Sequence, residues 1–161
     1  MLKQVQRTKV KLEVPARFAI VAARYNSTYT NALVRMAKAE FALAGVVHVD
    51  VVRVPGAFEI PVVVGRLTRS NPAYDAIICF AAILRGATSH ADHIALGVTH
   101  ALAQLQVDGG VPIVHGVLMF ENREQAKARC LEKDSNRGIE AAHTAMAMVE
   151  VMRSLPEKCL K

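Results

Sequence analysis

The chain has 161 residues, the length of one ordinary domain, and 52% of them are hydrophobic. It carries 20 lysines and arginines against 14 aspartates and glutamates, but aromatic residues make up only 5%, which disfavours stacking on nucleic-acid bases. No apolar run approaches the ~20 residues of a membrane span, and the three cysteines form no CxxC pair. We therefore expect one cytoplasmic domain over residues 1–161 that binds neither membranes nor nucleic acid, and whose basic charge suits a small phosphorylated substrate.

The first half of the chain alternates between strand and helix patterns. Residues 17–23 form a short apolar run rich in strand formers. Apolar residues then recur at helical spacing from Thr28 to Gly45, and glycine commonly ends helices. A second strand is predicted over 47–54, and a helix over 57–70 whose proline falls in the first turn, where proline is tolerated.

The second half repeats this alternation. Residues 75–83 are apolar on both faces, which is typical of a central parallel strand. A helix is predicted over 89–107, a strand over 111–119, a short helix over 125–130 and a final helix through the apolar residues of 139–149. Strands that alternate with helices predict an α/β fold, with a parallel four-stranded sheet covered by helices on both faces.

The N-terminal arm, residues 1–16, does not fit this alternation. Its segment VKLEV, residues 10–14, alternates like an edge strand but has no predicted partner in the domain. We expect it to pair with the sheet of a neighbouring subunit.

In an open parallel sheet, ligands bind beyond the carboxyl ends of the strands. Four segments are therefore expected to converge at one crevice: residues 24–26, 56–59, 84–90 and 115–121.

The segment RGATSH, residues 85–90, is a candidate anion site. Gly86, Ala87 and Thr88 would offer backbone N–H groups and a hydroxyl at a helix N-terminus, where the helix dipole favours negative charge, and Arg85 would add positive charge. The alternative is that Thr88 or Ser89 is only a helix N-cap. The spacing matches neither a Walker nor a dinucleotide-binding motif.

His90 is the candidate general acid or base, because histidine titrates near neutral pH. A lone histidine is more often structural, and that alternative stays open. His90 and His93 could also chelate a metal, but no cysteine or carboxylate completes a known ligand spacing, so we expect no metal.

Two acids and two aromatic residues are further candidates. Glu59 and Glu140 each fall near a predicted helix start, where the helix dipole alone would accommodate a carboxylate. Tyr25 and Phe58 would form a flat slot for a planar ring if both face the crevice, and ordinary helix–sheet packing is the alternative.

Several motifs in this order resemble the lumazine synthase family: RFAIVAARYN, VPGAFEIP, AAILRGATSHADH, VPIVHGVL and EQAKARC followed by NRGIEAA. The resemblance extends from Arg17 to Met152. It implies a flavodoxin-like three-layer αβα sandwich that assembles as a homopentamer, in some members as an icosahedral shell, with active sites between subunits. The VKLEV segment resembles the strand that such enzymes add to a neighbour's sheet.

The resemblance also implies a transferase of riboflavin biosynthesis. The reaction is condensation of 5-amino-6-(D-ribitylamino)uracil with 3,4-dihydroxy-2-butanone 4-phosphate to 6,7-dimethyl-8-ribityllumazine, with release of phosphate and water. It needs neither a metal nor an organic cofactor.

By matching positions, the resemblance makes His90 the proton-transfer residue and Glu140 the acid that orients it. Arg129 would reach the phosphate from a facing subunit. The substrate-binding positions implied in this way are Tyr25, Ala57, Phe58, Glu59, Ala82, Ile83, Leu84, Ala87, Thr88, His115, Arg129 and Arg137.

Three positions depart from the family's usual pattern. His115 stands where phenylalanine is usual, which predicts a polar contact with the pyrimidine, and Arg137 replaces a common lysine. Met119-Phe120 replaces a pair rich in hydroxyl groups.

A non-catalytic alternative keeps the same fold: a carrier of riboflavin or lumazine, or a shell-forming scaffold. His90 and Arg129 favour the enzyme, because a carrier of an unphosphorylated ligand needs neither.

Overall fold

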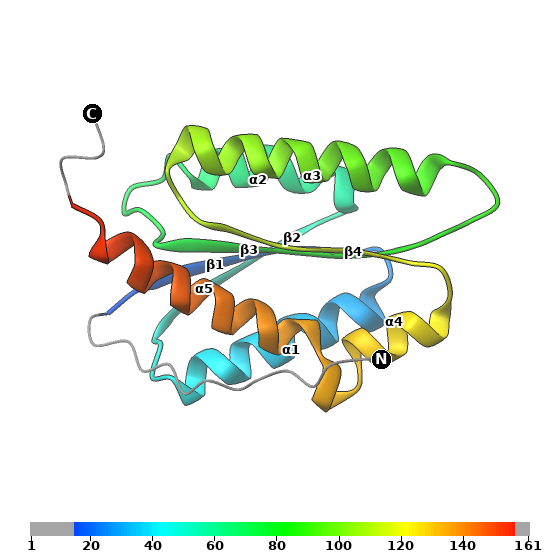
Figure 1. Cartoon of the computed structure of the whole chain (residues 1–161), viewed down its shortest axis with the longest axis horizontal. Coiled ribbons are helices and arrows are strands. Elements are labelled where there is room, and N and C mark those ends of the chain that lie inside the picture. Colours follow the sequence, from blue (N-terminus) through cyan, green and yellow to red (C-terminus); the bar gives the residue numbers. More distant parts are fainter. Residues whose placement is uncertain (1–14, 157–161) are drawn as a thin grey trace.

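The computed structural model describes residues 15–156, which form three layers with a parallel sheet in the middle (Figure 1). The elements in chain order are β1 (Arg17–Ala23), α1 (Ser27–Leu43), β2 (His48–Val54), a 3-10 helix (Ala57–Glu59), α2 (Ile60–Leu67), β3 (Ala76–Leu84), α3 (His90–Gly109), β4 (Ile113–Phe120), α4 (Arg123–Cys130), a 3-10 helix (Lys133–Ser135) and α5 (Arg137–Ser154). The predicted VKLEV strand lies outside the described residues.

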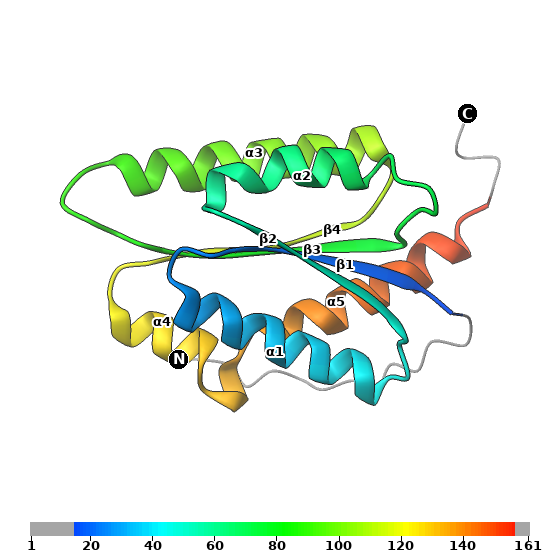
Figure 2. The ribbon, with the colours of Figure 1, turned by 180° about the vertical axis from the view of Figure 1, so that it is seen from behind.

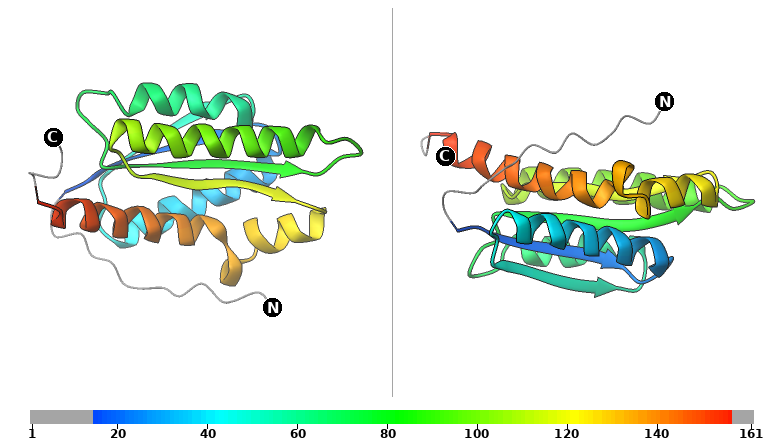
Figure 3. Two further views of the ribbon diagram at one scale, coloured as in Figure 1. Left: turned by 45° about the horizontal axis from the view of Figure 1, so that its top comes forward. Right: turned by 90° about the horizontal axis from the view of Figure 1, so that it is seen from below.

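The four strands are all parallel, in the order β2-β1-β3-β4. Because β3 pairs with both β1 and β4, the prediction of a central strand there is confirmed. The strands β2 and β4 form the two edges of this sheet. The carboxyl ends of the strands gather at one end of the molecule, as the arrowheads in Figure 3 show.

Helices cover both faces of the sheet, as the alternation of elements predicts. The helices α2 and α3 lie on one face, and α1, α4 and α5 lie on the other (Figures 1 and 2). Alternate strand residues enter the two cores: Phe80 packs towards α1 and α5, whereas Cys79 packs towards α2 and α3. Cys79 is a small buried core residue, as expected, and its burial raises the pKa of its thiol. No helix within the described residues is long and apolar enough to cross a membrane.

The ends of the elements follow local capping chemistry. Gly45 has φ 78 and follows the last turn of α1, as predicted. Pro61 lies in the first turn of α2, also as predicted, but α2 ends at Leu67 instead of residue 70. The helix α4 begins two residues before its predicted start, because the Asn122 side chain accepts a hydrogen bond from the Gln125 N–H (2.9 Å).

One buried polar pair joins α1 to α5. His143 Nε2 lies 2.8 Å from Glu40 Oε2, and the side chains are 14% and 11% exposed. Within residues 15–156, the other ring nitrogen, Nδ1 of His143, is buried without a hydrogen-bond partner. The pair therefore fixes how α5 lies against α1, and α5 carries two of the candidate site residues.

Replacement of Glu40 by alanine should lower the free energy of unfolding by about 1–3 kcal/mol, because it leaves both His143 ring nitrogens buried without a partner. Urea unfolding followed by circular dichroism measures the loss. Glu150→Ala is the matched control, because Glu150 lies on the exposed face of α5 and its loss should change stability by less than about 0.5 kcal/mol. Equal effects of the two substitutions would contradict a structural role for the pair.

Candidate functional site

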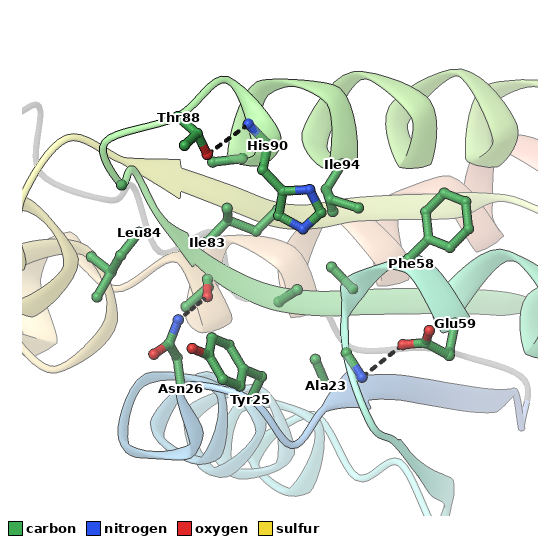
Figure 4. Close-up of a pocket in the computed structure, with 16 residues that line it drawn as sticks. Ala23, Tyr25, Asn26, Phe58, Glu59, Ile83, Leu84, Thr88, His90 and Ile94 are labelled. Carbon is green, nitrogen blue, oxygen red and sulfur yellow. Dashed lines mark hydrogen bonds between the residues drawn. The ribbon is translucent and has the colours of Figure 1, made fainter.

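A pocket of ≈ 530 Å³ opens at the carboxyl ends of the strands (Figure 4). Its walls come from the end of β1, the turn after β2, the end of β3, and the loop that leads into α3. The lining residues are Ala23, Tyr25, Asn26, Gly56, Ala57, Phe58, Glu59, Ala81, Ala82, Ile83, Leu84, Gly86, Thr88, His90, Ala91 and Ile94. Three of the four segments predicted to converge therefore do so.

The fourth segment, residues 115–121, does not line this pocket, so that part of the prediction was wrong for a single chain. His115 lies near the amino end of β4, away from the carboxyl ends of the strands, and lines a groove beside α5. Met119 and Phe120, at the carboxyl end of β4, line a pocket beside α4 instead.

The turn after β1 is shaped by Asn26. Its backbone lies in the left-handed region, with φ 54, and its side-chain amide donates a hydrogen bond to the carbonyl oxygen of Ala82 (2.7 Å). This bond ties the end of β1 to the end of β3 at the pocket wall. Sequence analysis did not select Asn26, although asparagine is one of the few residues that tolerate this conformation.

The PGAFE turn after β2 is held by its own acid. The N–H of Gly56 donates to Glu59 Oε2 (2.9 Å), so this carboxylate stabilises the turn while it lines the pocket. Glu59 therefore both holds the turn and faces the pocket, and its role towards a substrate stays a prediction.

Tyr25 and Phe58 both line the pocket and do not pack in the core, since they are 75% and 64% exposed. Figure 4 shows the two rings well apart, Tyr25 beside the β1 turn and Phe58 beside α3 and Ile94. They therefore do not enclose one flat slot within a single chain.

The ring of His90 points into the pocket, close to Ile83 and Ile94 (Figure 4). The N–H of His90 donates a long hydrogen bond to Thr88 Oγ1 (3.4 Å), and the Ser89 side chain makes no capping bond to α3. Ser89 therefore occupies the N-cap position of α3, as the alternative expected, but its hydroxyl group makes no capping hydrogen bond. Gly86 and Thr88 line the pocket, whereas Ala87 between them does not.

Arg85 does not lend its charge to the pocket, contrary to the expectation from the sequence. Its guanidinium group lies 2.6 Å from Asp92 Oδ1 and 3.2 Å from Glu121 Oε2, and Arg85 is not among the lining residues. The carboxylates of Asp92 and Glu121 thus compensate the positive charge of Arg85.

The remaining predicted residues lie on a second surface, beside β4. His115, Arg137 and Glu140 line a groove of ≈ 440 Å³, and Arg129 and Arg137 line an adjoining pocket of ≈ 560 Å³. Glu140 forms an ion pair with Arg137 and does not share a pocket with His90 in the same chain. Within residues 15–156, the guanidinium group of Arg129 has no hydrogen-bond or ion-pair partner.

His115 has a defined hydrogen-bonding state on this surface. The hydroxyl of Thr99 donates to the carbonyl oxygen of Ala95 (2.7 Å), so its oxygen accepts from His115 Nε2, 2.9 Å away.

The start of α5, which carries Arg137 and Glu140, is also well defined. The Asn136 side chain accepts from the N–H of Gly138 (2.8 Å) and donates to the carbonyl oxygen of Cys130. A Cβ at Gly138 would lie 2.3 Å from the Leu33 carbonyl oxygen, so the glycine allows α5 to approach α1. The NRG motif thus has a structural role besides any role of Arg137.

No group of three or more His, Cys, Asp or Glu side chains in the described part of the chain is placed to hold a metal ion.

Comparison with known proteins supports the family resemblance that the sequence motifs indicate. The family model described as 6,7-dimethyl-8-ribityllumazine synthase matches residues 15–153. The protein of that name from Halorhodospira halophila is 42% identical over 142 residues, which cover 87% of this chain and 90% of the relative. Its namesake from Stenotrophomonas maltophilia is 40% identical over 143 residues, 88% of this chain and 92% of the relative. On these grounds the chain belongs to the 6,7-dimethyl-8-ribityllumazine synthase family.

Proposed function

We propose that this chain condenses 5-amino-6-(D-ribitylamino)uracil with 3,4-dihydroxy-2-butanone 4-phosphate to 6,7-dimethyl-8-ribityllumazine, the penultimate step of riboflavin biosynthesis. One observation carries the assignment beyond family membership: the His90 ring points into a pocket whose wall includes the Gly86–Thr88 loop at the start of a long helix.

The reaction joins the amine of the pyrimidine to the ketone as a Schiff base. Phosphate then leaves, and the ring closes with loss of water. Each step moves a proton, and His90 is the titratable group placed to carry it. Thr88 and the backbone of Ala87 would hold the phosphate at the positive end of the α3 dipole.

The pyrimidine and its ribityl chain would occupy the rest of the pocket. Tyr25 would stack on the planar ring, and Ala57, Phe58 and Glu59 would line the ribityl chain. Ala82, Ile83 and Leu84 supply an apolar wall at the end of β3. Much of the rate enhancement would come from holding the two substrates together in the reactive orientation, without metal or organic cofactor.

The active site would be completed by a neighbouring subunit. His115, Arg129, Arg137 and Glu140 lie on a surface separate from the His90 pocket. If the β4 surface of one subunit faced the pocket of the next, Arg129 would reach the phosphate and Glu140 would reach His90. This heterologous contact closes into a ring, and we propose a homopentamer or a larger assembly of pentamers.

The N-terminal arm, residues 1–16 of a single domain over 1–161, would add its strand to a neighbour's sheet. The edge strand β2 supports this, since it pairs only with β1 within the described residues. We further propose a cytoplasmic location, which fits the buried free thiols of Cys79 and Cys130.

His90→Ala should lower kcat by about 10²- to 10⁴-fold, the usual range for a general acid or base. The fall should be near the lower end, because orientation supplies part of the rate. The wild-type pH–rate profile should contain an ionisation near neutral pH that the variant lacks. Formation of the product is followed by its fluorescence.

His93→Ala is the matched control for this substitution. His93 lies in the same first turn of α3 but is exposed and does not line the pocket. An effect of His93→Ala as large as that of His90→Ala would refute the assignment of proton transfer to His90.

Arg129→Ala should raise the KM for the phosphorylated ketone by about ten- to a hundredfold, because a charge-assisted contact contributes roughly 1.5–3 kcal/mol. The KM for the pyrimidine should change little. Arg123→Ala, at the exposed start of the same helix, is the control for loss of charge. Equal weakening for both substrates would show that Arg129 supports the subunit interface instead of the ligand.

A further inference from the structure

We propose that Arg85 is a positioning residue, which holds the loop of residues 86–89 in the shape that receives the substrate's phosphate. The inference rests on the proposed function, because it assigns a role to a residue that does not itself line the pocket. It replaces the simpler expectation that Arg85 attracts the phosphate directly.

Arg85 joins three elements at one point. Its backbone N–H donates to the carbonyl oxygen of Phe120 (2.9 Å), which extends the β3–β4 pairing by one residue. Its guanidinium group bonds to Asp92 in the first turn of α3 (2.6 Å) and to Glu121 immediately after β4 (3.2 Å). The end of β3, the end of β4 and the start of α3 are therefore connected through one side chain.

The loop between these anchor points has little else to hold it. Residues 85–90 are all exposed. The hydrogen bonds that the structure gives to residues 86–89 are local: Thr88 Oγ1 accepts from the N–H of His90 (3.4 Å), and the Ser89 carbonyl accepts from the N–H of His93 (3.1 Å). The position of this loop over the pocket thus depends on how its two ends are fixed.

The charges exclude a direct role for Arg85 in binding phosphate. Asp92 and Glu121 already compensate its charge, and neither Arg85 nor these two acids line the pocket. Each exposed ion pair is weak by itself, but both pairs share one guanidinium group and act on one loop. Removal of Arg85 would free the loop and would also leave two carboxylates without a counter-charge.

Two variants separate these consequences. Arg85→Ala removes the bridge and leaves both acids charged. The triple variant Arg85→Ala/Asp92→Asn/Glu121→Gln removes the bridge and the uncompensated charges together. Arg35→Ala, an exposed arginine on α1, controls for loss of one positive charge.

Arg85→Ala should raise the KM for the phosphorylated ketone, and the inhibition constant of inorganic phosphate, by about three- to tenfold. The KM for the pyrimidine should stay within about twofold. Amide hydrogen exchange of His90 and His93, whose N–H groups donate to the loop residues Thr88 and Ser89, should accelerate. The triple variant should show the same defect, because the bridge is still absent. Arg35→Ala should behave as wild type.

Three results would overturn the proposal: unchanged KM for the ketone in Arg85→Ala, equal weakening for both substrates, or full recovery in the triple variant. Full recovery would mean that Arg85 only shields the two acids. The proposed function is tested separately by whether the wild-type protein forms the lumazine at all. Even if it did not, the exchange rates and the direct binding of inorganic phosphate, measured by calorimetry, would still decide the role of Arg85.

Discussion

The parallel pairing of β1 with β3 is the constraint on which the pocket depends. The register sets Ala22 beside Phe80, so the turn after β1 lies alongside the last residues of β3. The Asn26 amide then donates to the Ala82 carbonyl oxygen and fixes the β1 turn against the end of β3 (2.7 Å). Two walls of the pocket are placed by this junction: Tyr25 follows β1, and the loop to His90 follows β3. The third wall, residues 56–59, follows β2, which pairs with β1.

The chemistry of the pocket follows from what the junction exposes. The ends of β1 and β3 provide apolar walls, while the loop after β3 begins a long helix whose dipole favours an anion. A phosphate held there would lie close to the one imidazole that points into the pocket, that of His90. In the function that we propose, a single chain would supply the anion seat, the proton carrier and the apolar wall, whereas its Arg129 lies on another surface.

Much of the fold and of this pocket could be predicted from the sequence. The period of the apolar residues identified each strand and helix, and the rule that ligands bind beyond parallel strands correctly brought together residues 24–26, 56–59 and 84–90. The rule failed for residues 115–121, because His115 lies near the amino end of β4 and the residues at the carboxyl end of β4 line a pocket beside α4. His115 therefore lies with α5 residues and bonds to Thr99 on α3.

Side-chain partners distant in the sequence could not be predicted either. Arg85 was expected to attract an anion, but the ends of β3 and β4 bring Glu121 to it, and the first turn of α3 brings Asp92. Likewise, Glu40 and His143 meet only because α1 packs on α5. The residues assigned by family resemblance divide between two surfaces, which periodicity alone does not reveal.

The central claim is that each active site combines the His90 pocket of one subunit with Arg129 of the next. It is tested most directly by dissociating and reassembling a mixture of the His90→Ala and Arg129→Ala proteins. The assay must use a ketone concentration well below the wild-type KM, where the raised KM of Arg129→Ala lowers its rate. In a ring with random placement, about a quarter of the sites would then contain both native residues, so the mixture should recover roughly that share of wild-type activity while each variant alone stays impaired. If reassembled mixed rings were no more active than the average of the two variants, the two residues would not act together in a shared site.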